Sequence, residues 1–233
     1  MKNQSIEVSV VMPCLNEQKT LGTCIEKAER TLNTLGIQGE VVVADNGSTD
    51  ESVAIAERLG VCVVHQPLRG YGAAYLAGFA AAQGKFIVMG DADDTYDFTD
   101  LERFITPLRN GYDLVIGNRF KGKMLPGAMP WARRYIGNPI LSGILRWLFG
   151  TSISDSHCGM RSFTTDAYTR MSLQTTGMEF ASEMIIKAVQ ANLKILEIPI
   201  NYYPRAGESK LNPIRDAARH IRFMLKCKVA DKI

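Results

Sequence analysis

Short apolar runs rich in β-branched residues alternate with amphipathic segments in the first part of the chain. The runs predict strands at residues 8–12, 40–45, 61–65, 86–90 and 113–117. Apolar residues three or four positions apart predict helices at residues 18–35, 49–59, 73–82 and 100–109. Because the strands are apolar throughout and alternate with helices, the pattern predicts an α/β fold with a mostly parallel central sheet flanked by helices.

Beyond residue 120 this alternation loosens. Residues 121–130 are rich in Gly and Pro, which predicts a mobile loop, and residues 151–163 are polar and predict irregular structure. Residues 131–149 form an apolar segment with interleaved arginines, and Pro139 is expected to break it. These segments separate the regular first part from the end of the chain.

Order returns near the end, with a helix at about residues 181–191 and a strand at 194–200. The tail then has an apolar stripe at helical spacing between basic residues, among which His220 is expected to be exposed. The stripe consists of Ile214, Ala217, Ala218, Ile221, Met224 and Leu225. We expect one domain over residues 1–211, followed by a basic amphipathic helix over 212–233.

Polar residues stand at the carboxyl ends of four predicted strands. They are Asn16 and Glu17, Asp45 and Asn46, Asp91 and Asp93, and Asn118 and Arg119. Parallel sheets covered on both faces bind ligands at the carboxyl ends of their strands. All four groups are therefore expected to open onto one crevice.

The composition is that of a soluble globular chain, with 46% hydrophobic and 22% charged residues among 233. It excludes a disordered tail, a collagen-like fibre and a polytopic membrane protein. Five scattered cysteines without a CxxC spacing argue against a disulfide framework or zinc site and favour a reducing compartment. No leader opens the chain and no apolar run reaches the roughly 18 residues that span a bilayer, so the chain as given is expected to cross no membrane, although it can be part of a longer protein that does.

The net charge of +3 averages over unlike parts. Residues 1–102 hold 7 Lys and Arg against 15 Asp and Glu, whereas residues 103–150 hold 8 against 1. Residues 151–200 are nearly balanced, and residues 201–233 hold 8 against 3. An acidic first part is thus followed by two basic blocks. These blocks lack any nucleic-acid signature, so nucleic acid is not an expected partner.

Asp91 and Asp93 directly follow the fourth predicted strand. Two carboxylates at positions i and i+2 can converge on one cation, and their oxygens suit Mg²⁺ or Mn²⁺, which would neutralise a diphosphate leaving group. For this motif alone, a solvated acidic turn is the alternative. Asp45 can accept from a base or ribose or serve only a turn, and Glu17 can bind the nucleoside or only favour a helix start.

Seven motifs cover the chain from about residue 8 to 212. They are VVMPCLNE (residues 10–17), VVVADNGSTD (41–50), GYGAAYLAG (70–78), GDADDTYDF (90–98), GNRF (117–120), DSHCGMRSF (155–163) and PRAGESKLN (204–212). With these motifs in this order, the chain resembles the family 2 glycosyltransferases with the GT-A fold, specifically the polyprenyl-phosphate (dolichyl-phosphate) hexose synthase branch. Residues 1–211 would then be the catalytic domain, with an amphipathic interfacial segment at about 130–150.

The resemblance implies an inverting, metal-dependent transfer of a hexose from a nucleotide-diphosphate sugar to a lipid phosphate. The nucleoside would be lined by Pro13, Leu15, Glu17, Ala44 and Asp45. The ribose, the diphosphate and a Mg²⁺ or Mn²⁺ ion would be held by Asp91, Ala92 and Asp93, with the metal on the two aspartates. Arg119 would meet the phosphates, and the family's Arg/Lys pair would fall on Arg205 and Lys210. UDP-glucose and GDP-mannose both stay open as donors.

Two positions depart from the family pattern. Thr95 stands at the second residue after the acidic motif, where family members often have Gln or Ser, and Asp94 adds an extra acid. Arg205 lies one residue closer to Gly207 than the family's common spacing. The first departure concerns which residues besides Asp93 would bind the metal. The second concerns whether Arg205 has the role of the family's arginine.

A lipid monophosphate acceptor is already anionic at neutral pH, so it needs cations rather than a general base. Arginine suits this role because its planar fork binds phosphate in a bidentate manner. The residues expected to act in catalysis are Asp93, Arg119, Arg133 and Arg134. The amphipathic segments 131–149 and 212–228 fit a peripheral position on the cytoplasmic face of a membrane, next to a polyprenyl phosphate, or else a packed stripe with a solvated basic face.

Other functions stay open. A family 2 transferase with a saccharide or small-molecule hydroxyl acceptor would need a general base, for which Glu179, Glu183 and Asp155 are candidates. A catalytically silent nucleotide-sugar sensor or a membrane-binding module is a further class, against which the complete set of Asp91, Asp93 and Arg119 argues.

Overall fold

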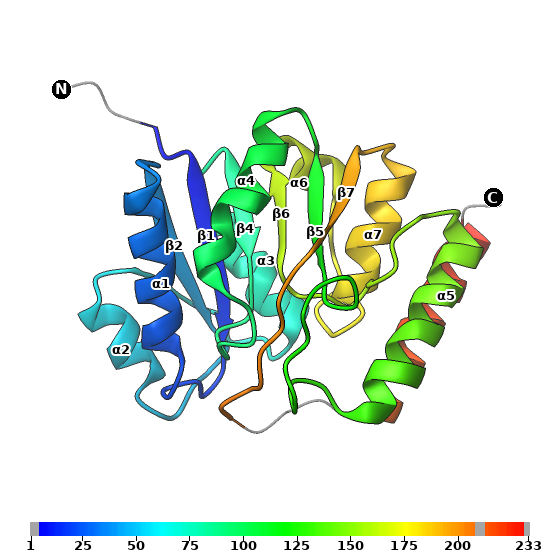
Figure 1. Cartoon of the computed structure of the whole chain (residues 1–233), viewed down its shortest axis with the longest axis horizontal. Helices are drawn as coiled ribbons and strands as arrows, with labels where there is room; N and C mark the ends of the chain where they lie inside the picture. Colours follow the sequence, from blue (N-terminus) through cyan, green and yellow to red (C-terminus); the bar gives the residue numbers. More distant parts are fainter. Residues whose placement is uncertain (1–4, 208–212, 231–233) are drawn as a thin grey trace.

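The computed structural model describes residues 5–207 and 213–230, and a seven-stranded sheet forms its centre. The strand order is β3-β2-β1-β4-β6-β5-β7 (Figure 1). The strands are β1 (Val8–Cys14), β2 (Gly39–Asp45), β3 (Cys62–His65), β4 (Phe86–Met89), β5 (Leu114–Asn118), β6 (Arg161–Thr164) and β7 (Ile195–Pro199). Among these strands β6 runs antiparallel to its neighbours β4 and β5, and the other pairs are parallel. The carboxyl ends of β1, β2, β4 and β5 therefore point the same way.

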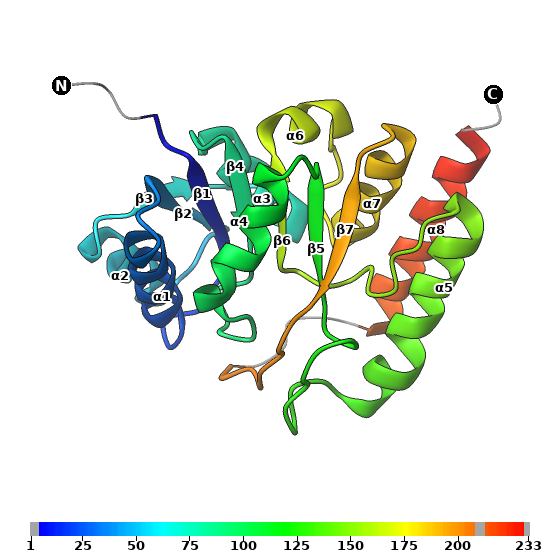
Figure 2. The ribbon, with the colours of Figure 1, turned by 45° about the horizontal axis from the view of Figure 1, so that its top comes forward.

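Helices cover both faces of the sheet. They are α1 (Leu21–Thr34), α2 (Ser52–Arg58), α3 (Tyr71–Ala81), α4 (Leu101–Arg109), α5 (Asn138–Phe149), α6 (Thr165–Met171), α7 (Phe180–Gln190) and α8 (Pro213–Ala230). Two short helical turns complete the set, the 3₁₀ turn η1 (Phe98–Asp100) and the π-helical turn η2 (Arg133–Gly137). Helices α1 and α4 lie on one face, and α3 and α7 lie on the other (Figure 1). Helices α5 and α8 lie side by side beyond α7, at the edge of the molecule (Figure 2).

The packing of β1 explains why its sequence does not alternate between apolar and polar residues. The side chains of residues 8–12 are all 0% exposed, because helices bury both faces of the strand. Gly78 lets α3 approach closely, since a Cβ atom there would lie 2.5 Å from Val11 Cγ1. This close packing holds the carboxyl ends of the central strands in place.

The structure confirms the α/β fold with its mostly parallel sheet. The six predicted strands and six predicted helices are all present, each end lying within three residues of its predicted position. The loop at residues 121–130 is also present, and Leu125 N donates to Tyr202 O at 3.0 Å. The regular part of the chain was thus readable from hydrophobic periodicity.

The prediction of irregular structure over residues 151–163 is wrong at its end, where β6 lies between β4 and β5. The sequence pattern missed β6 because three of its four residues are polar. Arg161 is 1% exposed and donates to three carbonyl oxygens, those of Ser156, Cys158 and Ala181, and Ser162 Oγ donates to Phe104 O. A central strand can carry such residues because every polar group finds a partner.

Three further expectations are corrected. Pro139 does not break the apolar segment, because the π-helical turn η2 directly precedes α5, with Asn138 N donating to Arg133 O, and the helix continues through Pro139 into α5. His220 is buried, at 3% exposure, since α8 packs against α7 through this residue's side of the helix. Leu225 is 51% exposed, so the predicted apolar stripe of α8 is buried only in part.

Candidate active site

The loops after β1 and β2 are joined by hydrogen bonds. Asn16 Oδ1 accepts from Thr49 N at 2.7 Å, and Ser48 Oγ accepts from Asn16 N at 2.9 Å. Ser52 Oγ accepts from Glu17 N at 2.9 Å. The φ of Asn16 is +54°, a left-handed conformation that asparagine adopts more readily than most residues. These bonds place Glu17 at the carboxyl ends of the strands.

Asp45 ends β2 as an ionised carboxylate in a buried position. Its oxygens accept from Gly47 N at 3.1 Å and Ser48 N at 3.0 Å, and His65 Nδ1 lies 3.6 Å away. Burial by itself would raise the pKa of Asp45, but hydrogen bonds from Ser48 and Gly47 outweigh it and lower that pKa. The carboxylate is therefore available as an acceptor, while it also forms the turn that the sequence allowed.

The other predicted nucleoside residues lie beside it. Pro13 and Ala44 are register partners on β1 and β2, and Leu15 follows β1 in a half-buried position. Ala92 is buried, and its carbonyl oxygen accepts from Thr20 Oγ1 at 2.7 Å. The structure thus brings these residues, which the family resemblance had named, to neighbouring strand ends.

Asp91 follows β4 and is held by two tyrosines from one face of α3. Its Oδ1 accepts from the hydroxyls of Tyr71 and Tyr75, both at 3.1 Å. Burial, and then the nearby charge of Asp93, raise the pKa of Asp91 to about 6. Gly159 approaches from the loop before β6, where a Cβ atom would lie only 2.8 Å from Asp91 Oδ2. The carboxylate therefore has a fixed position, and a nearby cation would favour its ionised form.

Asp93 faces two different partners through its two oxygens. Oδ1 accepts from Thr95 N at 3.1 Å and Thr95 Oγ1 at 2.6 Å, and Oδ2 lies 3.1 Å from Arg205 Nη1. Arg205 Nη2 also donates to Glu17 Oε1. The structure therefore brings Glu17, Asp93 and Arg205 together, although they are far apart in the sequence. Lys210, the other cation implied by the family motif, lies outside the described residues.

The structure shows what contacts are made by the residues at the positions that depart from the family pattern. Thr95 orients Asp93 through its hydroxyl and its backbone N–H. Asp94 has a φ of +59° and is engaged by Lys27 Nζ at 2.7 Å. The extra acid is thus paired within the protein, and the one-residue shift of Arg205 still lets it reach Asp93.

The donor set at this edge fits a divalent cation. Among residues 5–207 and 213–230, no three carboxylate, imidazole or thiol side chains are grouped so as to hold a metal ion by themselves. Asp91 and Asp93 nevertheless offer hard oxygen ligands, and burial, followed by repulsion from Asp93, raises the pKa of Asp91. A cation shared with phosphate oxygens would relieve that repulsion, so these two residues would hold it.

Arg119 follows β5 and is committed to Asp155. Its Nε and Nη2 donate to the two carboxylate oxygens at 2.8 and 2.7 Å, and its backbone N donates at 3.0 Å. The guanidinium also lies 5.1 Å from the ring centroid of Tyr202. Burial by itself would lower the pKa of Arg119, but Asp155 raises it well above its ordinary value. The arginine stays cationic, with its charge balanced inside the protein.

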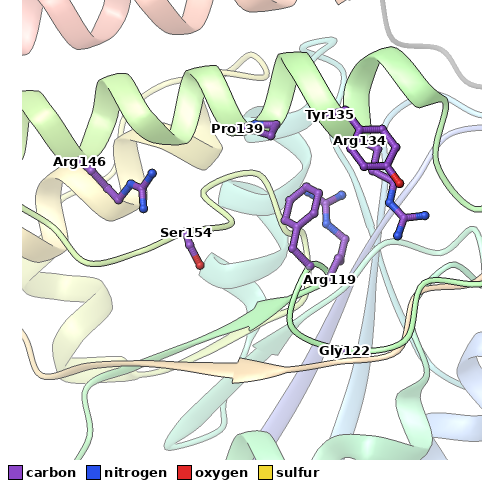
Figure 3. Close-up of a pocket in the computed structure, with 8 residues that line it drawn as sticks. Arg119, Gly122, Arg134, Tyr135, Pro139, Arg146 and Ser154 are labelled. Atoms are coloured by element: carbon purple, nitrogen blue, oxygen red, sulfur yellow. The ribbon is translucent and has the colours of Figure 1, made fainter.

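A pocket of about 410 Å³ opens beside Arg119. It is lined by Arg119, Phe120, Gly122, Arg134, Tyr135, Pro139, Arg146 and Ser154. Figure 3 shows Arg134 and Arg146 extending from η2 and α5 toward Arg119 and Ser154. Within the described chain, no carboxylate lies within 4.0 Å of the guanidinium of Arg134 or Arg146. Arg133, also expected to act in catalysis, does not line this pocket. The pocket is therefore suited to an anion.

The three carboxylates considered as general bases are all engaged. Asp155 is 0% exposed and bound to Arg119. Glu183 accepts from Gln174 N at 3.0 Å and Thr175 Oγ1 at 2.6 Å. Glu179 lies 3.1 Å from Arg219 Nε. Each of them stabilises the fold where it lies, so the structure provides no support for a free base among them.

A histidine pair anchors α8 to this half of the molecule. The rings of His157 and His220 meet edge to face at 4.4 Å between centroids, and His220 Nδ1 and Ser182 Oγ lie 2.8 Å apart. Burial lowers the pKa of His220 to about 4, so the ring is neutral at pH 7. This contact explains why a histidine within a basic helix is buried.

Sequence reasoning did not assign three of the residues at these sites. Tyr71 and Tyr75 lie in the GYGAAYLAG motif at a spacing of four, and that spacing places both hydroxyls on one helix face. Arg146 appeared only as an interruption of an apolar segment. Its place in the same helical segment as Arg134 and Tyr135 was the feature of the sequence that could have indicated a shared site.

The helical segment above the pocket exposes large apolar side chains. They are Trp131 (67% exposed), Tyr135 (56%), Ile136 (45%), Ile140 (54%) and Trp147 (83%). In the part of the chain that the structure describes, no helix is both long and apolar enough to cross a membrane. These side chains form an exposed apolar surface on the segment from Trp131 to Trp147.

Solved structures of glucosyl-3-phosphoglycerate synthase from Mycobacterium tuberculosis share this fold. The complex with Mn²⁺, uridine diphosphate and glucosyl-3-phosphoglycerate superposes with a TM-score of 0.73 over 96% of this chain and 80% of that chain, at 22% identity. The complex with Mn²⁺, UDP-glucose and phosphoglyceric acid has a TM-score of 0.74 over 96% and 79%, also at 22% identity. The fold is thus the GT-A fold of nucleotide-diphosphate-sugar transferases.

The sequence model of glycosyl transferase family 2 matches residues 9–172. The chain belongs to this family, which confirms the family resemblance given by its motifs.

Two relatives from Haloferax volcanii cover nearly all of the chain. It is 47% identical over 219 residues to the low-salt glycan biosynthesis hexosyltransferase Agl6, covering 94% of this chain and 53% of the relative. It is 31% identical over 229 residues to a dolichyl-phosphate hexose transferase, covering 97% of this chain and 96% of the relative. The chain thus spans about half of the first relative's length.

Proposed function

We propose that this protein transfers a hexose, with inversion, from a nucleotide-diphosphate sugar to a polyprenyl phosphate at a membrane surface. The observation that carries the proposal is the pocket beneath η2 and α5. It holds Arg134 and Arg146 without a carboxylate partner among the described residues, and it lies under a segment with exposed Trp131 and Trp147. An amphiphile with an anionic head and an apolar tail matches this combination.

The donor would bind at the strand ends on the acidic side. Pro13, Leu15, Glu17, Ala44 and Asp45 would line the nucleoside, and Asp45 is the ionised acceptor for a base N–H or a ribose hydroxyl. Asp91, Ala92 and Asp93 would lie against the ribose and diphosphate. UDP-glucose and GDP-mannose are both compatible with these residues. The M. tuberculosis synthase structures contain UDP or UDP-glucose, which supports a uridine donor for the first test.

A Mg²⁺ or Mn²⁺ ion, when bound, would neutralise the diphosphate as it leaves. Asp91 and Asp93 would hold it, and structures of the M. tuberculosis synthase contain Mn²⁺ or Mg²⁺ with UDP. Tyr71 and Tyr75 fix Asp91, and Thr95 fixes Asp93, so both carboxylates are positioned before substrate arrives.

The acceptor would need no general base. A phosphate oxygen of the lipid forms the new bond to the anomeric carbon, while the bond from that carbon to the donor diphosphate breaks and the nucleoside diphosphate leaves. Arg134 and Arg146 would reduce the repulsion between the two anionic substrates. The engagement of Asp155, Glu179 and Glu183 by other groups agrees with a reaction that uses none of them as a base.

Arg119 would contribute at the inner wall of the pocket. Its Nε and Nη2 are committed to Asp155, and its Nη1 forms no hydrogen bond within residues 5–207 and 213–230. This remaining edge can donate to the acceptor phosphate, while the ion pair keeps the guanidinium in place. Arg133 would act less directly, as part of the same basic segment near the membrane surface.

The membrane would contact the exposed segment 131–147 and the basic residues of α8, on the cytoplasmic face. Amphipathic helices bind anionic leaflets through buried apolar area together with basic charge. The 31% identity to a dolichyl-phosphate hexose transferase over 97% of the chain supports this acceptor class.

A small anionic acceptor is the second candidate. The solved synthase structures contain phosphoglyceric acid, and an arginine-lined pocket fits such a molecule as well. The exposed tryptophans have no role in that reaction, which is why the lipid acceptor is the preferred proposal.

The test is a transfer assay with radiolabelled donors. UDP-glucose and GDP-mannose are each combined with Mn²⁺ and with undecaprenyl phosphate, dolichyl phosphate, phosphoglycerate or a simple saccharide, and the products are partitioned between organic and aqueous phases. We expect label in the organic phase with a polyprenyl phosphate and none with the other acceptors. Transfer to phosphoglycerate or a saccharide without any lipid product would contradict the proposal.

A further inference from the structure

Arg205 spans two carboxylates that belong to different strand ends. Its Nη1 lies 3.1 Å from Asp93 Oδ2, after β4, and its Nη2 donates to Glu17 Oε1, after β1. The side chains of Glu17 and Asp93 are 11% and 9% exposed, and that of Arg205 is 24% exposed. Among the described residues, the guanidinium is therefore a cation that balances carboxylates from two strand ends.

The segment that precedes Arg205 packs against the residues that follow Asp93. Tyr203 N donates to Thr95 O at 3.1 Å, so the backbone of this segment pairs with the residues that follow Asp93. The rings of Tyr202 and Tyr96 lie 5.3 Å apart between centroids. These contacts fix the backbone two residues before Arg205, so any change in the position of the guanidinium would come from the side chain.

The arginine and a divalent ion would need the same oxygen. Asp93 Oδ1 already accepts twice from Thr95, so Oδ2 is the oxygen that remains for a cation, and it is the oxygen that Arg205 contacts. Two positive groups on one carboxylate oxygen repel each other strongly in a partly buried site. Binding of the ion is therefore opposed by the present position of the guanidinium.

A second observation points to another position for this side chain. The Nε atom of Arg205 is buried and has no hydrogen-bond partner in the described chain. A buried N–H without an acceptor is unfavourable, and the planar fork of arginine matches phosphate oxygens. An anion that enters the crevice would supply the missing acceptor.

We propose that Arg205 has two positions. Without substrate it is the counter-ion of Glu17 and Asp93, and when a nucleoside diphosphate enters with its divalent ion, the guanidinium leaves Asp93 and binds the diphosphate. The second position rests on the proposed function, whereas the first rests only on the contacts of this chain. One residue thus keeps the ion out until the nucleotide arrives and then helps to hold the nucleotide.

The test measures two affinities of the Arg205→Gln variant. Mn²⁺ binding is measured without nucleotide by electron paramagnetic resonance of the free ion, and UDP and GDP binding is measured at saturating Mn²⁺ by calorimetry. We expect Mn²⁺ alone to bind about tenfold more tightly than to the wild type, because the competing charge is gone. We expect the nucleotide that binds the wild type to bind about tenfold more weakly, because a charge-assisted hydrogen bond is lost.

Two further variants serve as controls. Arg205→Lys keeps the charge but has a shorter reach and fewer donors, so both affinities should fall between those of the wild type and the glutamine variant. Arg30→Gln removes an exposed arginine from α1, away from the crevice, and should change neither affinity. Thermal unfolding of each variant shows that the fold is kept.

The opposite signs of the two changes are the specific result. A merely structural role for Arg205 would weaken both affinities, and unchanged or weaker Mn²⁺ binding in Arg205→Gln overturns the first position. Tighter Mn²⁺ binding with unchanged nucleotide binding overturns the second. A wild-type protein that binds neither UDP nor GDP contradicts the proposed function itself, whereas transfer to a different acceptor contradicts only the acceptor and leaves the result for Arg205 unaffected.

Discussion

The candidate site has an acidic half at the ends of β1, β2 and β4 and a basic half at β5 and α5, and the two halves differ in how their charges are paired. On the side of β1, β2 and β4, carboxylates are held in fixed positions by hydroxyls and backbone N–H groups, and Arg205 is the cation that bridges two of them. On the side of β5 and α5, Arg119 is neutralised by Asp155, while Arg134 and Arg146 face a pocket without a carboxylate partner in the described chain.

This difference shows what each half needs from its ligand. In the acidic half Arg205 already pairs with two carboxylates, and a metal-bound diphosphate would take its place on Asp93, as proposed above. The basic half is complete only with an anion, which agrees with an acceptor phosphate. Substitutions in the two halves should therefore change different kinetic constants, and the experiments below test that separation.

The largest effect is expected at Asp93. In Asp93→Ala the carboxylate that would hold the divalent ion is lost, so turnover should fall by about 10³-fold or more with saturating Mn²⁺. The matched control is Asp94→Asn, since Asp94 is engaged by Lys27 and asparagine tolerates its positive φ. Turnover of the control should stay within a few fold of the wild type. Retained activity in Asp93→Ala would remove the metal-dependent mechanism.

A large loss of stability is expected in Arg119→Ala. Removal of one partner from a buried ion pair leaves Asp155 uncompensated, which costs about 3–5 kcal/mol of unfolding free energy, measured by urea titration. The value of kcat/KM should also fall far more than tenfold. The double variant Arg119→Ala/Asp155→Ala should recover stability without recovering activity. If activity returns with stability, Arg119 only positions the loop and does not contact substrate.

Acid should lower the free energy of unfolding through protonation of His220. Its folded-state pKa of about 4 lies below the unfolded value of about 6.5, so the unfolded chain binds more protons between these values. The stabilisation is present above pH 6.5 and is lost as the pH falls to 4, by at most about 3 kcal/mol. His220→Gln should flatten this part of the curve of unfolding free energy against pH. An unchanged pH dependence in the variant would exclude His220 as its source.

A moderate and selective effect is expected in the pocket. Arg146→Gln and Arg134→Gln should each raise KM for polyprenyl phosphate by about tenfold and leave KM for the nucleotide sugar unchanged. Arg58→Gln, an exposed arginine at the end of α2, is the control and should change neither constant. A larger change in KM for the nucleotide sugar than for the lipid would contradict the division into two halves.

The smallest effect is expected at the proposed membrane surface. Trp147 is 83% exposed, and Trp147→Ser should reduce sedimentation with anionic lipid vesicles several-fold, because apolar area no longer enters the interface. Tyr112→Ser removes an exposed aromatic side chain outside this segment and should leave vesicle binding unchanged. Equal binding of the wild type and Trp147→Ser would argue for a small acceptor in solution.

Much of the acidic half was readable from sequence, and less of the basic half. Asp91 and Asp93 follow an apolar strand directly, so their position at the carboxyl edge of the sheet came from local pattern alone. The strand β6 escaped prediction because Arg161 and Ser162 are polar, and their partners come from other parts of the chain. Prediction from periodicity assumes that buried residues are apolar. A buried strand with polar residues is therefore predicted to be exposed and irregular.

The sequence by itself determined the α/β class, the alternation of strands and helices, the family motifs and the acids at the strand ends. Only the tertiary structure decided how the charges are paired. Arg119 meets Asp155 across 36 residues, and Arg205 meets Glu17 across 188. Hydrophobic patterning is repeated along the chain and can be recognised locally, whereas an ion pair depends on where two distant segments are brought by the packing of the whole sheet.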